Sequence, residues 1–283
     1  MEPATIENTN PRHDPTPPVP VRTWRHGSVF VATFLGAWLG LELTATSPPV
    51  AASAAAALLA AGAVLTGSAM LTSQESPVEV ARRIGLRRPN ARGLLAATLV
   101  GTAVVATYVA GAALLGIDLE VRANWPTVLV GVLLFHGMAE ELVWRGYAFS
   151  HLRSRHRFWR AIAWSVPLIA VTHVPIIAGN GIAIGAVAVL TAAVTCLPFA
   201  YLWERSGRTV WAPAIVHGMQ GSWQLFERTY ADEFSLLVMG TSIVVPLSAF
   251  LFRRRFFEAR IPDALGAHRS GGKPTINPKG IQP

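Results

Sequence analysis

Eight apolar segments, each about 18 to 24 residues long, divide this chain of 283 residues. A helix of about 20 residues spans the ~30 Å hydrocarbon core of a bilayer. Lipid offers the backbone no hydrogen-bond partner, and a helix satisfies its own backbone groups within each segment. The sequence therefore predicts an all-α polytopic membrane protein with about eight transmembrane helices. The segments are residues 28–47, 49–72, 93–116, 126–149, 161–178, 181–203, 209–227 and 234–252.

The charge content agrees with a chain embedded in a lipid bilayer. Only 14% of the residues are charged, whereas a soluble domain carries about 25%. The formal net charge of +8 does not indicate a nucleic-acid partner, because the basic residues lie in short runs between the apolar segments. A single cysteine, Cys196, excludes an intramolecular disulfide and is predicted to be a small packing residue in a helix.

The basic residues also predict the orientation. With the amino terminus in the cytoplasm, 21 of the 24 Lys and Arg residues fall on the cytoplasmic side, and the external loops hold Arg122 and Arg228. We therefore expect a bacterial-type plasma membrane protein with both termini cytoplasmic. Residues 1–26, which contain six prolines, form a disordered leading segment in this prediction. Residues 27–252 form the helical domain, and residues 253–283 form a cytoplasmic tail.

Ionisable residues gather within the apolar segments, where each costs about 2.5–3.5 kcal/mol to insert. The fourth segment holds His136, Glu140, Glu141 and Arg145 within three helical turns. Glu141 and Arg145 are four residues apart and are predicted to pair on one helix face.

Two further histidines lie at a similar predicted depth. From the inner ends of their helices, Glu140, His173 and His217 are about 15, 18 and 12 Å deep at ~1.5 Å per residue. Three titratable groups from separate spans could therefore meet in one polar cavity.

Such a cluster suits hydrolysis of a polar bond inside the membrane. A carboxylate of this cluster could take a proton from water as a general base, and a histidine beside it could share that water or hold a metal. A second histidine could stabilise an oxyanion. The same three residues, Glu140, His173 and His217, could alternatively bind a divalent metal such as zinc with an open position for water.

The motifs around these residues resemble those of the CAAX prenyl protease and bacteriocin-processing (abortive infection) family of intramembrane endopeptidases. Glu140, Glu141 and Arg145, followed by Gly146, resemble the first motif. His173 matches the histidine of Phe-x-x-x-His, with Ile169 at the Phe position. The third motif is His-x-x-x-Asn or Asp. His217 matches its histidine, and Gly221 stands at the Asn position. The resemblance covers about residues 125–230.

The resemblance implies an endopeptidase that cleaves a membrane-associated peptide or protein near the cytoplasmic face. It implies Glu140 as catalytic base with His173, His217 as the oxyanion or metal residue, and Glu141 and Arg145 as supports. Because the family Asn is absent at Gly221, Gln220 or Gln224 could supply the missing group from nearby helix positions.

Two other functions remain open from the sequence. The departure at Gly221 is also compatible with an inactive relative that acts as a membrane scaffold or immunity factor. The buried charges could instead form a relay in a small proton-coupled transporter. Transporters often carry inverted repeats, and no internal repeat is visible in the sequence.

Overall fold

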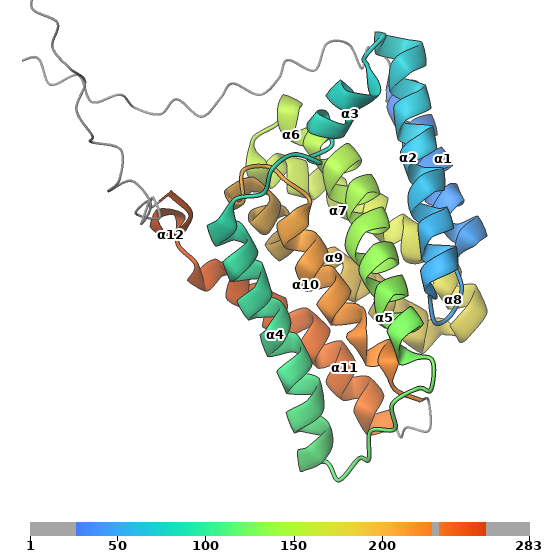
Figure 1. Ribbon diagram of the computed structural model, residues 1–283, viewed down its shortest axis with the longest axis vertical. Helices are drawn as coiled ribbons and strands as arrows, with labels where there is room; N and C mark the ends of the chain where they lie inside the picture. Colours follow the sequence, from blue (N-terminus) through green and yellow to red (C-terminus); the bar gives the residue numbers. More distant parts are fainter. Residues whose placement is uncertain (1–26, 228–231, 259–283) are drawn as a thin grey trace, which may run out of the picture.

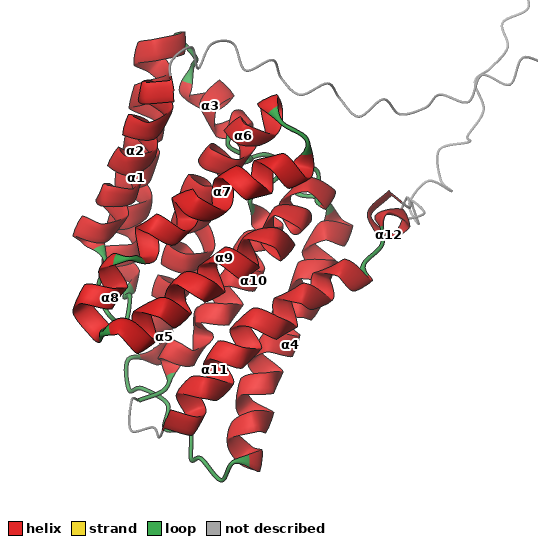
Figure 2. Cartoon of the chain, turned by 180° about the vertical axis from the view of Figure 1, so that it is seen from behind, coloured by secondary structure: helices red, strands yellow, loops and turns green. Residues whose placement is uncertain are grey.

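The computed structural model describes residues 27–227 and 232–258, and this part of the chain is built from helices and loops (Figures 1 and 2). The prediction of an all-α membrane protein is confirmed. The predicted leading segment 1–26 and residues 259–283 of the predicted tail lie outside the described residues. The elements are α1 (Gly27–Thr44), α2 (Ala51–Ser73), α3 (Pro77–Arg83), α4 (Ala91–Leu114), α5 (Trp125–Val132), η1 (Leu133–Ala139), η2 (Leu142–Phe149), α6 (Ser150–Arg155), α7 (Phe158–His173), α8 (Pro175–Asn180), α9 (Ile182–Arg205), α10 (Trp211–Gln220), η3 (Gly221–Leu225), α11 (Asp232–Val244), η4 (Val245–Leu251) and α12 (Arg254–Glu258).

Seven helical stretches in the described part of the chain are long and apolar enough to cross a membrane. The expected span at 209–227 is the exception and corrects the count of eight. It consists of α10, with 10 residues, followed by η3, a 3₁₀ helix of 5 residues. Ten α-helical residues extend about 15 Å, which is half of the hydrocarbon core. Apolar composition is the same whether a helix faces lipid or protein, so the sequence did not reveal that this segment is short and packs against α4, α9 and η1.

Although short, α10 and η3 connect the same two ends of the bundle as α4, which lies beside α10 (Figure 1). At one end, Trp211 Nε1 donates to the Arg87 carbonyl at 2.9 Å, just before α4 begins. At the other end, Arg122 N donates to the Leu225 carbonyl at 2.9 Å, after α4 has ended. Within residues 27–227 and 232–258 the chain therefore still makes eight passes between the two ends, which is the number that the predicted alternation of loops expects.

Basic loops that are distant in sequence meet at one end of this bundle. Arg87 Nη2 donates to the Arg208 carbonyl at 3.2 Å, and Arg92 Nη1 donates to the Phe256 carbonyl at 2.9 Å. Arg153 forms two hydrogen bonds of 3.0 Å with Glu204. The opposite end carries Arg122, which pairs with Glu227 at 3.0 Å. The bundle thus has one strongly basic end, as the positive-inside pattern requires.

The orientation prediction can be tested with topology reporters fused at the ends of the helices. Fusions after residues 90, 155 and 206 should report the cytoplasm, because these positions lie in loops at the basic end of the bundle. Fusions after residues 120 and 179 should report the external side. An external signal after residue 90 would contradict the predicted orientation.

Candidate active site

The helical stretch Trp125–Arg155 carries most of the polar cluster and departs from regular α-helix around it. Two π-helical runs, η1 and η2, flank the pair Glu140–Glu141. π-Helical turns are rare and occur frequently at functional sites. Here they accompany the four ionisable side chains that were predicted from the sequence to share this stretch.

Two glycines allow α10 to approach η1 closely. A Cβ atom placed on Gly137 would lie 2.9 Å from the Ala214 carbonyl oxygen, and one placed on Gly218 would lie 2.8 Å from Leu133 Cδ2. Neither side chain would fit without movement of its neighbour. Because both positions are glycine, His217 on α10 comes within hydrogen-bonding distance of Glu140 and Glu141.

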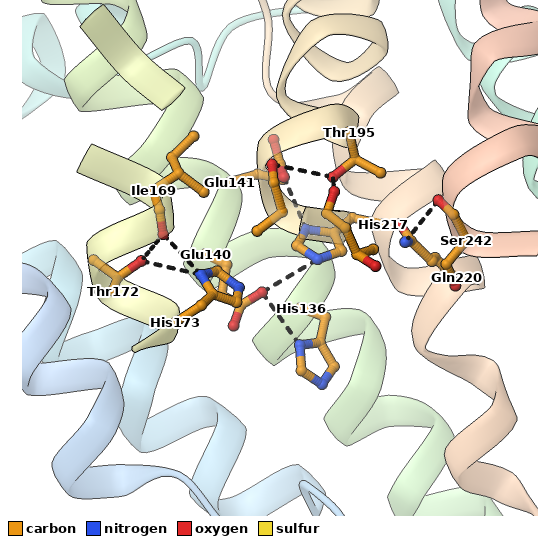
Figure 3. Close-up of polar contacts among 12 residues, drawn as sticks. His136, Glu140, Glu141, Ile169, Thr172, His173, Thr195, His217, Gln220 and Ser242 are labelled. Carbon is orange, nitrogen blue, oxygen red and sulfur yellow. Dashed lines mark hydrogen bonds and ion pairs between the residues drawn. The ribbon is translucent and has the colours of Figure 1, made fainter. Parts of the chain in front are cut away.

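Glu141 is buried at the centre of the cluster. Its Oε1 accepts a hydrogen bond from Arg145 Nη1 at 2.9 Å. It accepts another from His217 Nδ1 at 2.8 Å (Figure 3). The Glu141 and Arg145 side chains are 0% and 2% exposed. The Arg145 guanidinium also lies 4.9 Å from the centroid of the Phe199 ring. The predicted pairing of Glu141 with Arg145 is therefore present, and it also holds His217.

Glu140 points in a different direction and borders a cavity. Its Oε2 lies 3.2 Å from His136 Nδ1 and 3.3 Å from His217 Nε2 (Figure 3). Two imidazole rings from different helices therefore hold one carboxylate oxygen. His217 contacts both glutamates, one through each ring nitrogen.

His173 borders the same cavity at the carboxyl end of α7. Its Nδ1 donates to the Ile169 carbonyl at 2.8 Å, so in the neutral ring Nε2 is left as a hydrogen-bond acceptor. The Trp144 ring lies against both histidines, with centroids 5.2 Å from His173 and 5.8 Å from His217. Trp144 therefore packs between two residues that the sequence placed in the site.

The cavity has a volume of about 320 Å³ and combines a polar end with apolar walls. Glu140, His136, His173 and His217 form the polar end. The apolar walls come from α8, α9 and α11 and include Ile176, Ile184, Val187, Val238 and Met239.

His136 is a site residue to which the sequence-based assignment gave no role, and its partner Gln224 is one of the two glutamines considered there as substitutes for the family Asn. His136 contacts Glu140, as described above, and its Nε2 lies 2.9 Å from Gln224 Nε2. The available signal was the spacing of four residues between His136 and Glu140, which places them on one helix face. Gln220, by contrast, donates to the Ser242 carbonyl at 3.2 Å and does not hold any of the histidines.

The donor atoms that could hold a metal ion differ from the set expected from the sequence. Among the described residues, His136, Glu140 and His217 offer ligand atoms that all lie within 4.8 Å of one another. His173, which was expected as a ligand, is not part of this group. Two imidazoles and one carboxylate match the donors of catalytic zinc sites.

Residues 122–222 match the family model described as Type II CAAX prenyl endopeptidase Rce1-like. The match spans about a third of the chain and contains Glu140, Glu141, Arg145, His173 and His217. Neither the curated proteins nor the solved structures gave a match.

The chain is thus a multi-pass membrane protein that carries an Rce1-like domain. The family resemblance of its motifs is confirmed. At the level of the family, residues 122–222 are similar to CAAX-type intramembrane endopeptidases.

The buried pairing predicts a large stability difference between two arginine variants. Arg145→Ala should lower the free energy of unfolding in detergent by about 3–5 kcal/mol, because it leaves the Glu141 carboxylate buried with one partner fewer. Arg153→Ala, which breaks the partly exposed pair with Glu204, should cost about 1 kcal/mol or less. Equal losses in the two variants, measured by denaturant or thermal unfolding, would contradict a structural role for Arg145.

Proposed function

We propose that this protein is an intramembrane endopeptidase in which Glu140 activates the attacking water. The observation that carries the proposal is the position of Glu140 Oε2, held by two imidazole nitrogens at 3.2 and 3.3 Å on the border of a cavity. A carboxylate fixed in this way can accept a proton from a water molecule in the cavity. The Rce1-like match supports hydrolysis of a peptide bond as the reaction.

His173 is proposed to share this water with Glu140. Its Nδ1–H is committed to the Ile169 carbonyl, which leaves Nε2 free to accept a hydrogen bond from the water. The contact with Trp144 restricts the ring. The two acceptors would orient the water so that its oxygen faces the substrate carbonyl carbon.

His217 is proposed to stabilise the oxyanion. When both ring nitrogens carry hydrogens, it donates to Glu141 through Nδ1 and to Glu140 through Nε2. The charges of Arg145 and protonated His217 then balance those of Glu140 and Glu141. As the water loses its proton to Glu140, the Nε2–H of His217 can turn its hydrogen bond to the new oxyanion.

The proposed reaction balances without an additional reactant. The water oxygen forms a bond to the carbonyl carbon, and Glu140 takes the water proton. The tetrahedral intermediate then collapses, the C–N bond breaks, and Glu140 returns the proton to the leaving amine. The products are a new carboxylic acid and a new amine, which become a carboxylate and an ammonium group once the acid proton passes to the amine.

The proposed substrate is a membrane-associated peptide or protein segment with an apolar side chain near the scissile bond. The support is the apolar wall of the cavity, formed by residues such as Ile184, Val187 and Met239. Nothing in this cavity requires a prenylated substrate.

A divalent metal such as zinc would be held by His136, Glu140 and His217, whose donor atoms are close enough for one ion. Glu141 would then bond the outer nitrogen of His217, an arrangement common around metal-bound histidines. When bound, the ion would supply Lewis-acid polarisation of a carbonyl or water.

The proposal predicts a specific loss in the Glu140→Gln variant. Gln is nearly isosteric with Glu but cannot take the water proton, so turnover of a membrane peptide should be abolished while thermal unfolding stays close to that of the wild type. Glu204→Gln, at the Arg153 pair and away from the cavity, serves as the matched control and should retain turnover.

Two outcomes of that assay would count against the proposal. Full activity of Glu140→Gln would remove this residue from the mechanism. A wild type that cleaves no member of a broad panel of membrane peptides would favour the inactive scaffold or immunity factor, for which Gly221 is the supporting observation.

A chelator separates the metal-free mechanism from a metal-dependent one. A water activated by Glu140 and His173 alone should leave turnover unchanged after dialysis against a strong chelator, and elemental analysis should find no stoichiometric metal. Loss of turnover that is restored by one equivalent of zinc would instead assign an ion to His136, Glu140 and His217.

A further inference from the structure

We infer that His136 is the positioning residue of Glu140, and that it fills the space which a side chain at position 221 would otherwise occupy. The inference rests on the proposed role of Glu140 as base. It adds a residue from η1 to the site and gives a physical reason for glycine at position 221.

His136 is bonded through both of its ring nitrogens. Its Nδ1 lies 3.2 Å from Glu140 Oε2, and its Nε2 lies 2.9 Å from Gln224 Nε2. With the Gln224 amide nitrogen donating to Nε2, the ring hydrogen is on Nδ1 and is donated to Glu140. Gln224 thus selects the tautomer that supports the carboxylate.

Gly221 is required for space and not for backbone conformation. Its φ angle is −72°, which any residue can adopt. A Cβ atom at this position would lie 3.0 Å from His136 Cδ2 and 2.9 Å from Val132 Cγ1. Both distances are shorter than an ordinary van der Waals contact of about 3.5–4.0 Å between carbon atoms. A side chain at 221 would therefore require both the His136 imidazole and the Val132 side chain to move.

Position 221 lies one helical turn beyond His217, so a side chain there would enter the cavity beside that histidine. In this chain the polar group at that place comes from His136 on the neighbouring helix, whose ring centroid is 5.8 Å from that of His217. The His136 imidazole, which lies on η1, thus takes the place of the missing Asn of the third motif.

Gln220 and Gln224 have different partners, so their substitution can distinguish support of the catalytic base from support of the fold. Gln224 bonds His136, whereas Gln220 bonds the Ser242 carbonyl through its side chain and accepts from Tyr108 through its own carbonyl. Removal of Gln224 should act through His136. Removal of Gln220 should act through the packing of α11.

Substitutions at 136 can distinguish the two ring nitrogens. The Asn amide nitrogen approximates the place of Nδ1, and the Gln amide nitrogen approximates that of Nε2. His136→Ala should lower kcat about 10–100-fold with little change in KM, the usual scale for a lost supporting hydrogen bond. His136→Asn should recover most of kcat, and His136→Gln should not. Gln224→Ala should lower kcat in the wild type but add nothing to His136→Ala, whereas Gln220→Ala should add its own effect.

A stability cycle tests the shared space without any enzymatic activity. Gly221→Asn should lower the melting temperature by about 2–4 °C or more when His136 is present. The same change should cost less in a His136→Ala background, where the contact with Val132 remains but the ring has gone.

Three results would overturn the inference. One is an equal fall in melting temperature for Gly221→Asn in both backgrounds. Another is equal kcat for the Asn and Gln variants at 136. The third is a wild type that loses turnover when treated with a chelator, together with an inactive His136→Asn variant. That pair of results would make His136 a metal ligand. If the wild type has no turnover, the proposed function fails, and the stability cycle alone decides whether His136 and position 221 share one space.

Discussion

The site depends on the hydrogen bonds that the buried carboxylate of Glu141 accepts from Arg145 and His217. A charged group that is 0% exposed within apolar surroundings is stable only when it is paired and hydrogen-bonded. Arg145 and His217 both bond its Oε1. The first contact lies within one helix and the second joins that helix to α10. Glu141 therefore fixes His217, and the preceding residue, Glu140, is placed at the border of the cavity as a consequence.

The short helix α10 can hold its histidine deep in the bundle because other helices enclose it. It packs on α4, α9 and η1, and its end at Gly221 passes into a 3₁₀ turn. Irregular backbone at membrane depth is tolerated where protein surrounds it and supplies hydrogen-bond partners. Tyr108 on α4 does so directly, since its hydroxyl donates to the Gln220 carbonyl at 2.8 Å.

Features set by local spacing could be predicted from the sequence. The spans were visible as apolar lengths, the Glu141–Arg145 pair as a separation of four residues, and the meeting of Glu140 with His217 as a matched depth. Features set by contacts between helices could not. The enclosure of α10 depends on its neighbours, and the contact of His136 with Gln224 depends on how two helices are rotated. His136 was visible beside Glu140 in the sequence, but its second partner was not.

The replacement of an Asn at 221 by an imidazole at 136 is compatible with the electrostatics of a membrane interior. When His217 carries hydrogens on both ring nitrogens, as in the proposed mechanism, Arg145 and His217 balance the charges of Glu140 and Glu141, and His136 adds no charge while its one ring hydrogen is on Nδ1. A carboxamide and a neutral imidazole leave this balance unchanged, whereas a carboxylate at 221 would add a negative charge beside two others. Position 221 therefore needs only to leave space for the His136 ring, which glycine does. The imidazole brings a hydrogen-bond donor to the same part of the cavity without a further charge to insert.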